Sequence, residues 1–289
     1  MALPRLGLRR APREERGGWR HLPALLIATA FLVPLYFMFS GSLRKAGLPP
    51  PRTPELLPSP LAWSNYERAF ELVDIPRYTL NSLVVVAFAV PLTVLTASWA
   101  GFVMTRLPRR WAGALVALSL IALMVPLTAL LVPRFVIFKN LGLVDTYVPL
   151  VAPAIMGTSP FYVLLYYWSF QRVPSSLFEA ARLEGLGPWE IWRRVAMPLV
   201  RPVTVAVAVL AFVVTWGNFL DPLIFLVDQE KFTVPLGLRA LASLDRTNFP
   251  LLLAGSVATT LPVIVAFLYA QRSFLKQFRG PGWLGEGKG

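Results

Sequence analysis

The sequence is dominated by six long stretches that contain no Asp, Glu, Lys or Arg. Each holds roughly the twenty residues that an α-helix needs to cross a hydrocarbon core of ~30 Å. Backbone groups inside lipid must be hydrogen-bonded within their own segment, and the continuous apolar run 83–90 lacks the alternation of a barrel strand. We therefore expect an all-α membrane protein with six transmembrane helices. The expected spans are Leu22 to Ser42, Tyr78 to Thr105, Trp111 to Pro133, Thr146 to Gln171, Pro202 to Leu220 and Thr247 to Gln271.

Positive charge is distributed unevenly between the two sides that these spans would separate. With the N-terminus inside, the inner segments hold 18 Lys and Arg and the outer segments hold 10. Because membrane proteins concentrate Lys and Arg in their cytoplasmic loops, this bias predicts an N-in, C-in orientation. The formal net charge of +13 is then a topology signal, and we expect no nucleic-acid partner.

This topology divides the chain into three parts. We expect a cytoplasmic basic N-terminal segment (1–21), a six-helix transmembrane domain embedded in the bilayer (22–271) and a cytoplasmic C-terminal tail (272–289). The basic residues before the first span could also be the start of a signal peptide. The apolar run that follows is too long for one, and five further spans come later, so we interpret it as an uncleaved first helix.

The residue inventory excludes several kinds of chemistry. The chain has no cysteine and one histidine, His21, which excludes disulfides, thiol catalysis and Cys/His metal sites. It has no H-E-x-x-H and no G-x-S-x-G motif, so we expect neither an enzyme nor a metal site. The segment Gly282 to Gly289 imitates a phosphate-binding loop but lacks the final Ser or Thr and a preceding strand. We expect no cofactor in this chain.

The long inner loop between the fourth and fifth spans, 172–201, has the pattern of two short helices. Ser176 and Glu179 have the spacing of a capping box, and the helix that follows should end at Gly185, because glycine tolerates a left-handed C′ conformation. Pro188 fits the first position of a second helix, which continues through Trp189.

This loop is similar to the EAA motif of binding-protein-dependent importer permeases, which reads EAA, three residues, G, nine residues, I, one residue, L and P. The sequence has Glu179-Ala180-Ala181, three residues, Gly185, nine residues, then Val195-Ala196-Met197-Pro198. The resemblance implies a coupling helix that docks into a groove of a separate cytoplasmic ATPase. The alternative is an amphipathic interfacial loop that merely joins two spans. The expected coupling residues are Glu179, Ala180, Ala181, Leu183, Gly185, Pro188, Trp189 and Pro198.

Further segments resemble the sugar-importing branch of these permeases, and in particular the shorter, maltose-type permease. They include 65–70, 97–106, 141–147 and 271–274, so the resemblance covers nearly the whole chain. It implies an ATP-driven sugar importer in a prokaryotic cytoplasmic membrane. The implied partners are a second homologous permease, two ATP-binding subunits that bind ATP and Mg²⁺, and an extracytoplasmic sugar-binding protein.

Candidate substrate contacts lie at the end of the fifth span. Trp216 offers a flat face to a sugar ring, while Asn218 and Asp221 offer acceptors for sugar hydroxyls. Trp216 could instead be a packing or interfacial residue. Asp221 could equally be a solvated helix end, because 19 residues of helix place it about 29 Å from Pro202, near the outer boundary.

An ion-coupled secondary transporter is the competing function. It would favour paired ionisable groups near the membrane midplane and an inverted repeat. Neither is visible in the sequence, and such a transporter has no need of a loop that contacts an ATPase. The sequence therefore favours the ATP-driven importer.

Overall fold

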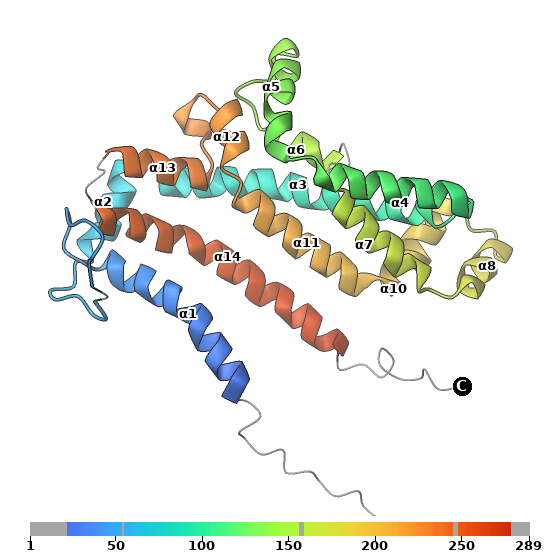
Figure 1. The fold of residues 1–289 in the computed structure, drawn as a ribbon, viewed down its shortest axis with the longest axis horizontal. Coiled ribbons are helices and arrows are strands. Elements are labelled where there is room, and N and C mark those ends of the chain that lie inside the picture. The colour runs from blue at the N-terminus through green and yellow to red at the C-terminus, as the bar shows by residue number, and fades with distance from the viewer. Residues whose placement is uncertain (1–21, 54, 156–158, 245–247, 279–289) are drawn as a thin grey trace, which may run out of the picture.

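The computed structural model describes residues 22–53, 55–155, 159–244 and 248–278, and this part of the chain is helical with no strand. Figure 1 shows an elongated bundle in which the longest helices run roughly along one direction. The α-helices are α1 (Leu22–Ser42), α2 (Ser64–Leu72), α3 (Ile75–Met104), α4 (Arg109–Met124), α5 (Leu131–Asn140), α6 (Val148–Ile155), α7 (Pro160–Gln171), α8 (Ser175–Leu183), α9 (Pro188–Glu190), α10 (Met197–Leu199), α11 (Arg201–Trp216), α12 (Leu220–Phe225), α13 (Val234–Leu244) and α14 (Phe249–Phe278). The 3₁₀ turns η2 (Leu127–Leu130) and η4 (Gln229–Lys231) and the π-helical turn η3 (Ile191–Ala196) complete the order.

Four helical segments are long and apolar enough to cross a membrane, and the number rises to six if each of two bent pairs counts as one span. The four are Leu22–Ser42, Ile75–Met104, Val148–Gln171 and Phe249–Leu268. In one bent pair, α4 and the segment 127–140 meet at 87°, and in the other, the segment 188–199 and α11 meet at 86°. The first bend lies inside the expected third span, and the second lies just before the expected fifth span, which begins at Pro202.

A proline accounts for the first of these bends. Val125 precedes Pro126 and is extended, with ψ 120°, as the steric demand of a following proline requires. The fifth span was expected to continue to Leu220, but α11 ends at Trp216 and the short helix α12 begins at Leu220. Between them, the Asn218 carboxamide oxygen accepts the backbone N–H of Asp221 at 3.3 Å.

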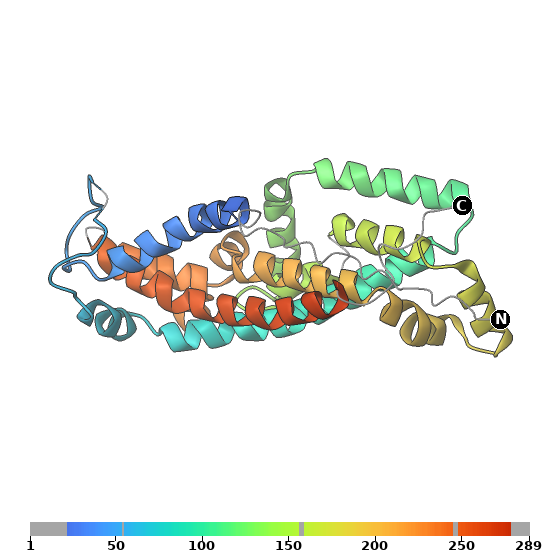
Figure 2. The ribbon, with the colours of Figure 1, turned by 90° about the horizontal axis from the view of Figure 1, so that it is seen from below.

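The α3 helix is the central element of the bundle, and it packs against α6, α7 and α11. The α1 and α14 helices lie side by side and form a separate layer, as Figures 1 and 2 show. Gly101 is where α3 and α7 approach most closely. A Cβ atom there would lie 2.8 Å from the Tyr166 Cβ and 2.8 Å from the Tyr167 backbone nitrogen.

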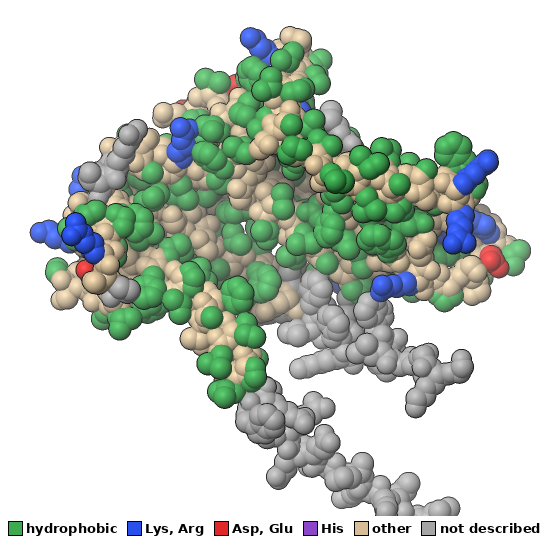
Figure 3. Space-filling model, in the orientation of Figure 1, with side chains coloured by type: hydrophobic (Ala, Val, Ile, Leu, Met, Phe, Trp, Pro, Cys, Tyr) green, Lys and Arg blue, Asp and Glu red, His purple; other side chains and the backbone are tan. Residues whose placement is uncertain are grey.

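Large apolar side chains are exposed over much of the helical surface. Figure 3 shows them as a broad band across the middle of the molecule, with Lys and Arg gathered mainly towards its two ends. The α1 helix carries Leu26 and Phe31 at 63% and 77% exposure, and Met124 at the end of α4 is 82% exposed. An exposed apolar surface of this extent is suited to lipid or to another protein rather than to water.

The close approach at Gly101 gives a direct test of the α3–α7 packing. We expect Gly101→Ala to lower the apparent melting temperature of the purified protein in detergent by about 5 °C, because the added methyl would force two helix backbones apart. Gly113→Ala in α4 is the matched control, since a Cβ there meets nothing within 4 Å. An equal or smaller loss at position 101 than at position 113 would contradict this packing.

Candidate functional site

The loop expected to contact an ATPase forms a compact element at one end of the bundle, which we call the elbow (residues 175–199) (Figure 1). Its first helix ends as expected. Gly185 has φ +82°, its N–H donates to the Arg182 carbonyl at 2.9 Å, and the Leu186 N–H donates to the Ala181 carbonyl at 3.1 Å. These two bonds form a Schellman motif, which satisfies the last carbonyls of α8 and reverses the chain.

The expected capping box at the start of this helix is wrong. The α8 helix begins at Ser175, after Pro174 with ψ 132°, and no side chain caps it. Ser176 is therefore already inside the first turn, where its backbone is helical and it cannot serve as the N-cap. The Glu179 side chain is left exposed on the surface of α8.

The second arm of the elbow begins at Pro188, as the sequence predicts. The Glu190 carboxylate accepts the Gly187 N–H at 3.4 Å, which helps to cap this start. The arm then widens into a π-helical turn, in which the Met197 N–H donates to the Trp192 carbonyl. Pro198 has no N–H to donate, and its ring would clash with a carbonyl four residues earlier, so the wider turn relieves this conflict.

Three tryptophans, one on α3 and two on the elbow, pack together where the second arm meets the end of α3. The ring centroid of Trp99 lies 5.2 Å from that of Trp189 and 5.5 Å from that of Trp192, and the two elbow rings lie 4.5 Å apart. Trp192 is buried in the same core cluster as Ile191. Edge-to-face aromatic pairs stabilise a contact by more than the burial of their apolar area alone, so this packing holds the second arm against α3.

The first arm is attached by a second aromatic group. Phe102 of α3 makes edge contacts with Phe170 of α7 and with Phe178 of α8, at centroid distances of 5.6 and 6.1 Å. The Arg106 guanidinium lies 4.7 Å from the Phe102 ring centroid and 4.1 Å from that of Phe178. A cation held over two rings binds the start of the α3–α4 connection to the elbow.

The side chains of the elbow divide between an attached face and a free face. Ala181, one of the expected coupling residues, is 4% exposed and packs against the bundle. Ala180, Gly185 and Pro198 are exposed, as is Pro188. Leu183 is 90% exposed, and Trp189 keeps 48% of its surface free although it touches Trp99.

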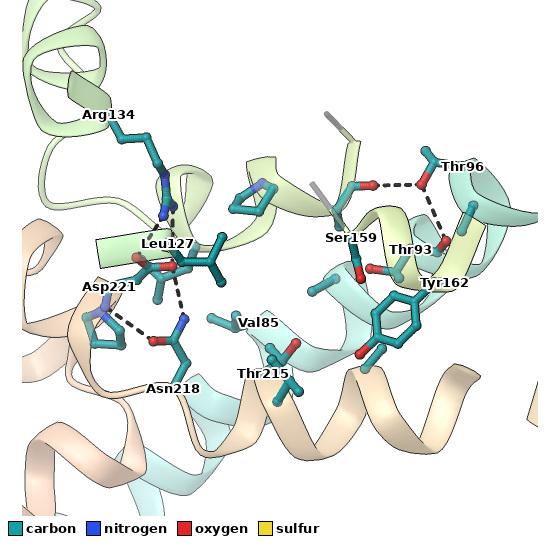
Figure 4. Close-up of a pocket in the computed structure, with 18 of the residues that line it drawn as sticks. Val85, Thr93, Thr96, Leu127, Arg134, Ser159, Tyr162, Thr215, Asn218 and Asp221 are labelled. Carbon is teal, nitrogen blue, oxygen red and sulfur yellow. Dashed lines mark hydrogen bonds and ion pairs between the residues drawn. The ribbon is translucent and has the colours of Figure 1, made fainter. Parts of the chain in front are cut away.

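A cavity of about 350 Å³ opens within the bundle, close to the middle of α3. One face of α3 lines it with side chains that recur every three or four residues, namely Ser82, Val85, Ala89, Thr93 and Thr96. Other lining residues come from η2, α5, α6, α7, α11, α12 and the segments next to them, and include Tyr162, Thr215 and Thr233. Figure 4 shows hydroxyl-bearing residues at one side of this space and charged residues at the other.

The charged side of the cavity is a network around Asp221. The Arg134 guanidinium donates to both Asp221 carboxylate oxygens, at 2.9 and 3.2 Å, and also to the Pro149 carbonyl at 3.1 Å. The Asn218 amide donates to the same carboxylate at 3.0 Å (Figure 4). Asp221 is only 8% exposed, so the interpretation of this residue as a solvated helix end is wrong.

Arg134 was not predicted as a site residue. In the sequence it contributed only to the number of Lys and Arg residues in the expected outer segments, although it directly follows an apolar stretch that ends at Pro133. An isolated arginine and an isolated aspartate, each at the end of an apolar run, are a signal that could have paired them, because buried charges require partners.

Trp216 is not among the residues that line the cavity. It is 7% exposed and packs in a separate core cluster with Tyr78 and Leu251. Its ring stacks on Phe212 at a centroid distance of 5.7 Å. The structure thus brings Asn218 and Asp221 together at the cavity and places Trp216 in the packed core.

A second ion pair joins the same two regions of the chain outside the cavity. Asp145, with φ +64°, accepts the backbone N–H groups of Val227 and Asp228 at 2.9 and 3.0 Å and the Lys231 ammonium at 2.6 Å. The hydrogen bond from Lys231 is the largest cause, followed by the two backbone bonds, of a lowering of the Asp145 pKa to about 2. Asp145 therefore holds the α5–α6 connection to the α12–η4 connection.

Comparison with known proteins identifies the family to which this chain belongs. Residues 89–274, which contain the elbow and most of the cavity, match the family model described as binding-protein-dependent transport system inner membrane component. The chain belongs to this family. It is therefore a subunit of a membrane transport system, with several helices that are apolar and long enough to cross the membrane.

Two relatives and one solved structure illustrate the similarity. The chain is 31% identical to the arabinooligosaccharides transport system permease protein AraQ of Bacillus subtilis, over 87% of this chain and 90% of that protein. It is 29% identical to the diacetylchitobiose uptake system permease protein NgcG of Streptomyces coelicolor, over 87% and 84%. A chain of a bacterial transporter that imports the acidic polysaccharide alginate shares the fold, with a TM-score of 0.69, 21% identity and coverage of 92% of this chain and 99% of that one.

The Asp145 contact predicts a pH dependence of this permease. The folded-state pKa of about 2 lies below the usual 3.8, so the stabilisation is complete above about pH 4 and is lost as the pH falls towards 2. We expect Asp145→Asn to lower the apparent melting temperature at pH 7 by about 2 °C, the effect of a partly exposed ion pair. The difference from wild type should vanish near pH 2.

Glu67→Gln is the matched control, because Glu67 is exposed and forms no ion pair or side-chain hydrogen bond among the described residues. Thermal unfolding of wild type and both variants in the same detergent, followed between pH 7 and pH 2, measures the effect. A difference between wild type and Asp145→Asn that stays constant with pH would contradict the role of the Asp145 charge.

Proposed function

We propose that this chain is one of two membrane-spanning permease subunits of an ATP-driven sugar importer in a prokaryotic inner membrane. A second homologous permease completes the pathway, two ATP-binding subunits dock on the cytoplasmic side with ATP and Mg²⁺, and a sugar-binding protein docks outside. The family supports the transport role and the dependence on a binding protein. The relatives that transport arabinooligosaccharides and diacetylchitobiose support sugar as the cargo.

The proposed topology has six spans in residues 22–271, with residues 1–21, the loop 172–201 and residues 272–289 inside. The first bent pair provides the third span, and the α11 half of the second pair provides most of the fifth. The α3–α4 connection and the elbow lie at the same end of the bundle, opposite α2 and α13, as an inner and an outer side require (Figure 1). The inner segments carry 18 of the 28 Lys and Arg residues, which supports this orientation.

The elbow is the proposed contact with the ATPase, and one observation carries this assignment. A leucine side chain that is 90% exposed at the tip of α8 has no role within the chain, and α8 is held from behind by Phe178 and Ala181. A rigidly mounted apolar tip is suited to a partner pocket. Glu179, Ala180 and Gly185 lie exposed on the same short element and would surround the contact.

The packing of the elbow against α3 would transmit a movement of the ATPase to the cavity. Trp99 touches both Trp189 and Trp192, and it lies on α3 only three residues beyond Thr96, which lines the cavity. A displacement of the elbow would therefore move the cavity wall through a continuous helix. Such a movement between two discrete arrangements is the basis of alternating access.

The exposed leucine gives the test of this function. In the complete transporter reconstituted with its binding protein and sugar, we expect Leu183→Asp to reduce sugar-stimulated ATP hydrolysis about tenfold and to weaken co-purification of the ATPase, because a charge would enter an apolar pocket. Leu57→Asp is the matched control, since Leu57 is 72% exposed and lies in the loop at the opposite end. Full coupling in Leu183→Asp would count against the assignment of the elbow.

A further inference from the structure

The described residues that line the cavity include a single positive and a single negative side chain, Arg134 and Asp221. All the other described lining residues are uncharged. The two opposite charges are bound to each other at 2.9 Å, so the charges of the cavity cancel within its own wall. From this charge balance we propose that the Arg134–Asp221 pair restricts the cavity to uncharged sugars and excludes sugar acids. This inference rests on the proposed function and specifies its cargo.

The pair is saturated by contacts within the chain, so little binding capacity of Arg134 remains for a ligand. One guanidinium nitrogen donates to one carboxylate oxygen, and another donates to the second oxygen and to the Pro149 carbonyl. Asp221 in turn accepts from Asn218. The carboxylate of a sugar acid would have to displace Asp221 from Arg134, which would leave a mostly buried aspartate without its cation.

The remaining polar groups of the cavity are suited to hydroxyls. Thr93, Thr215 and Tyr162 bring hydroxyls to the lining (Figure 4). Hydroxyls can donate and accept, as the hydroxyls of a neutral sugar also can.

The size of the cavity agrees with a small sugar. A volume of about 350 Å³ lies at the lower end of the range of small-molecule sites. Apolar residues of α3 and α11, such as Val85 and Val214, complete the lining and can pack against the ring carbons of a sugar. The charge balance then decides between a neutral sugar and an acid of the same size.

Charge-altered variants test the inference. Asp221→Asn keeps the size of the side chain and leaves Arg134 as an uncompensated cation. Arg134→Gln leaves the aspartate, and the double variant removes both charges. The measurement is calorimetric titration of the assembled transporter in nanodiscs without its binding protein, which removes the selection that this protein would impose. The ligands are matched pairs: galactose and galacturonate, glucose and glucuronate, and 4-O-α-galactobiose and digalacturonate.

The readout is the ratio of affinities for the neutral and the acidic member of a pair. We expect wild type to prefer the neutral member at least about tenfold, and Asp221→Asn to reduce or reverse this preference by a similar factor. The double variant should prefer the neutral member again, and Arg134→Gln should reject the acid at least as strongly as wild type. A ratio is insensitive to a smaller folded fraction, so a destabilised variant still gives a result.

Two outcomes would overturn the inference. In the first, wild type prefers the acidic member, or Asp221→Asn keeps the wild-type ratio. If the wild-type transporter also imports a neutral sugar with ATP, the importer function stands and only the charge selection fails. In the second, the wild-type complex neither binds nor imports any neutral sugar, and then the proposed function fails together with this inference.

Discussion

The aromatic packing between the elbow and the end of α3 is the contact that fixes the position of the elbow on the bundle. Trp99 meets Trp189 and Trp192, and Phe102 meets Phe178 beneath the Arg106 guanidinium. Without these contacts the elbow would be two short helices joined by a turn, and helices of nine and three residues are not stable alone. Their stability comes from the bundle, and so does their orientation.

The same helix connects this attachment to the cavity and to the opposite end of the bundle. The middle of α3 lines the cavity, and near its start the Asn81 amide donates to the carbonyls of Glu230 and Phe232 at 2.8 and 3.0 Å. The Ser82 hydroxyl accepts the Val234 N–H at 2.9 Å. The Arg134–Asp221 and Asp145–Lys231 ion pairs join α5 and its loop to α12 and η4. The segment 230–234 therefore moves with α3 or breaks its hydrogen bonds to Asn81 and Ser82.

Local features of the fold could be predicted from the sequence where one residue type decides the backbone. Gly185 adopts the left-handed C′ conformation, Pro188 starts the second arm, and four of the expected spans correspond to segments long and apolar enough to cross a membrane. The capping box at Ser176 failed because the helix starts two residues earlier than predicted, with Pro174 at its N-cap. The sizes of the bends at Pro126 and near Val200, 87° and 86°, could not be predicted, since a proline in an apolar run can kink a span slightly or end it.

The candidate site was harder to predict because it depends on which distant residues meet. Asn218 and Asp221 were found from the sequence, but their partner Arg134 is 87 residues away from Asp221. Trp216 lies only two residues before the cavity residue Asn218, yet it packs in a different core cluster, and no pattern of the sequence distinguishes the two sides of this helix end. Ala181 was likewise assigned to the docking face, although it packs against the bundle.

The most direct test of the central claim, that the elbow is the contact with the ATPase, uses the absence of cysteine from the chain. Leu183→Cys introduces a single thiol at the exposed tip of α8, and a photoactivatable maleimide on it can report its neighbour in the assembled transporter. The account predicts a crosslink to the ATP-binding subunit, with a yield that changes when ATP is bound. Modification of this thiol by a membrane-impermeant maleimide applied from outside the cell, or no crosslink to the ATPase in the intact complex, would contradict it.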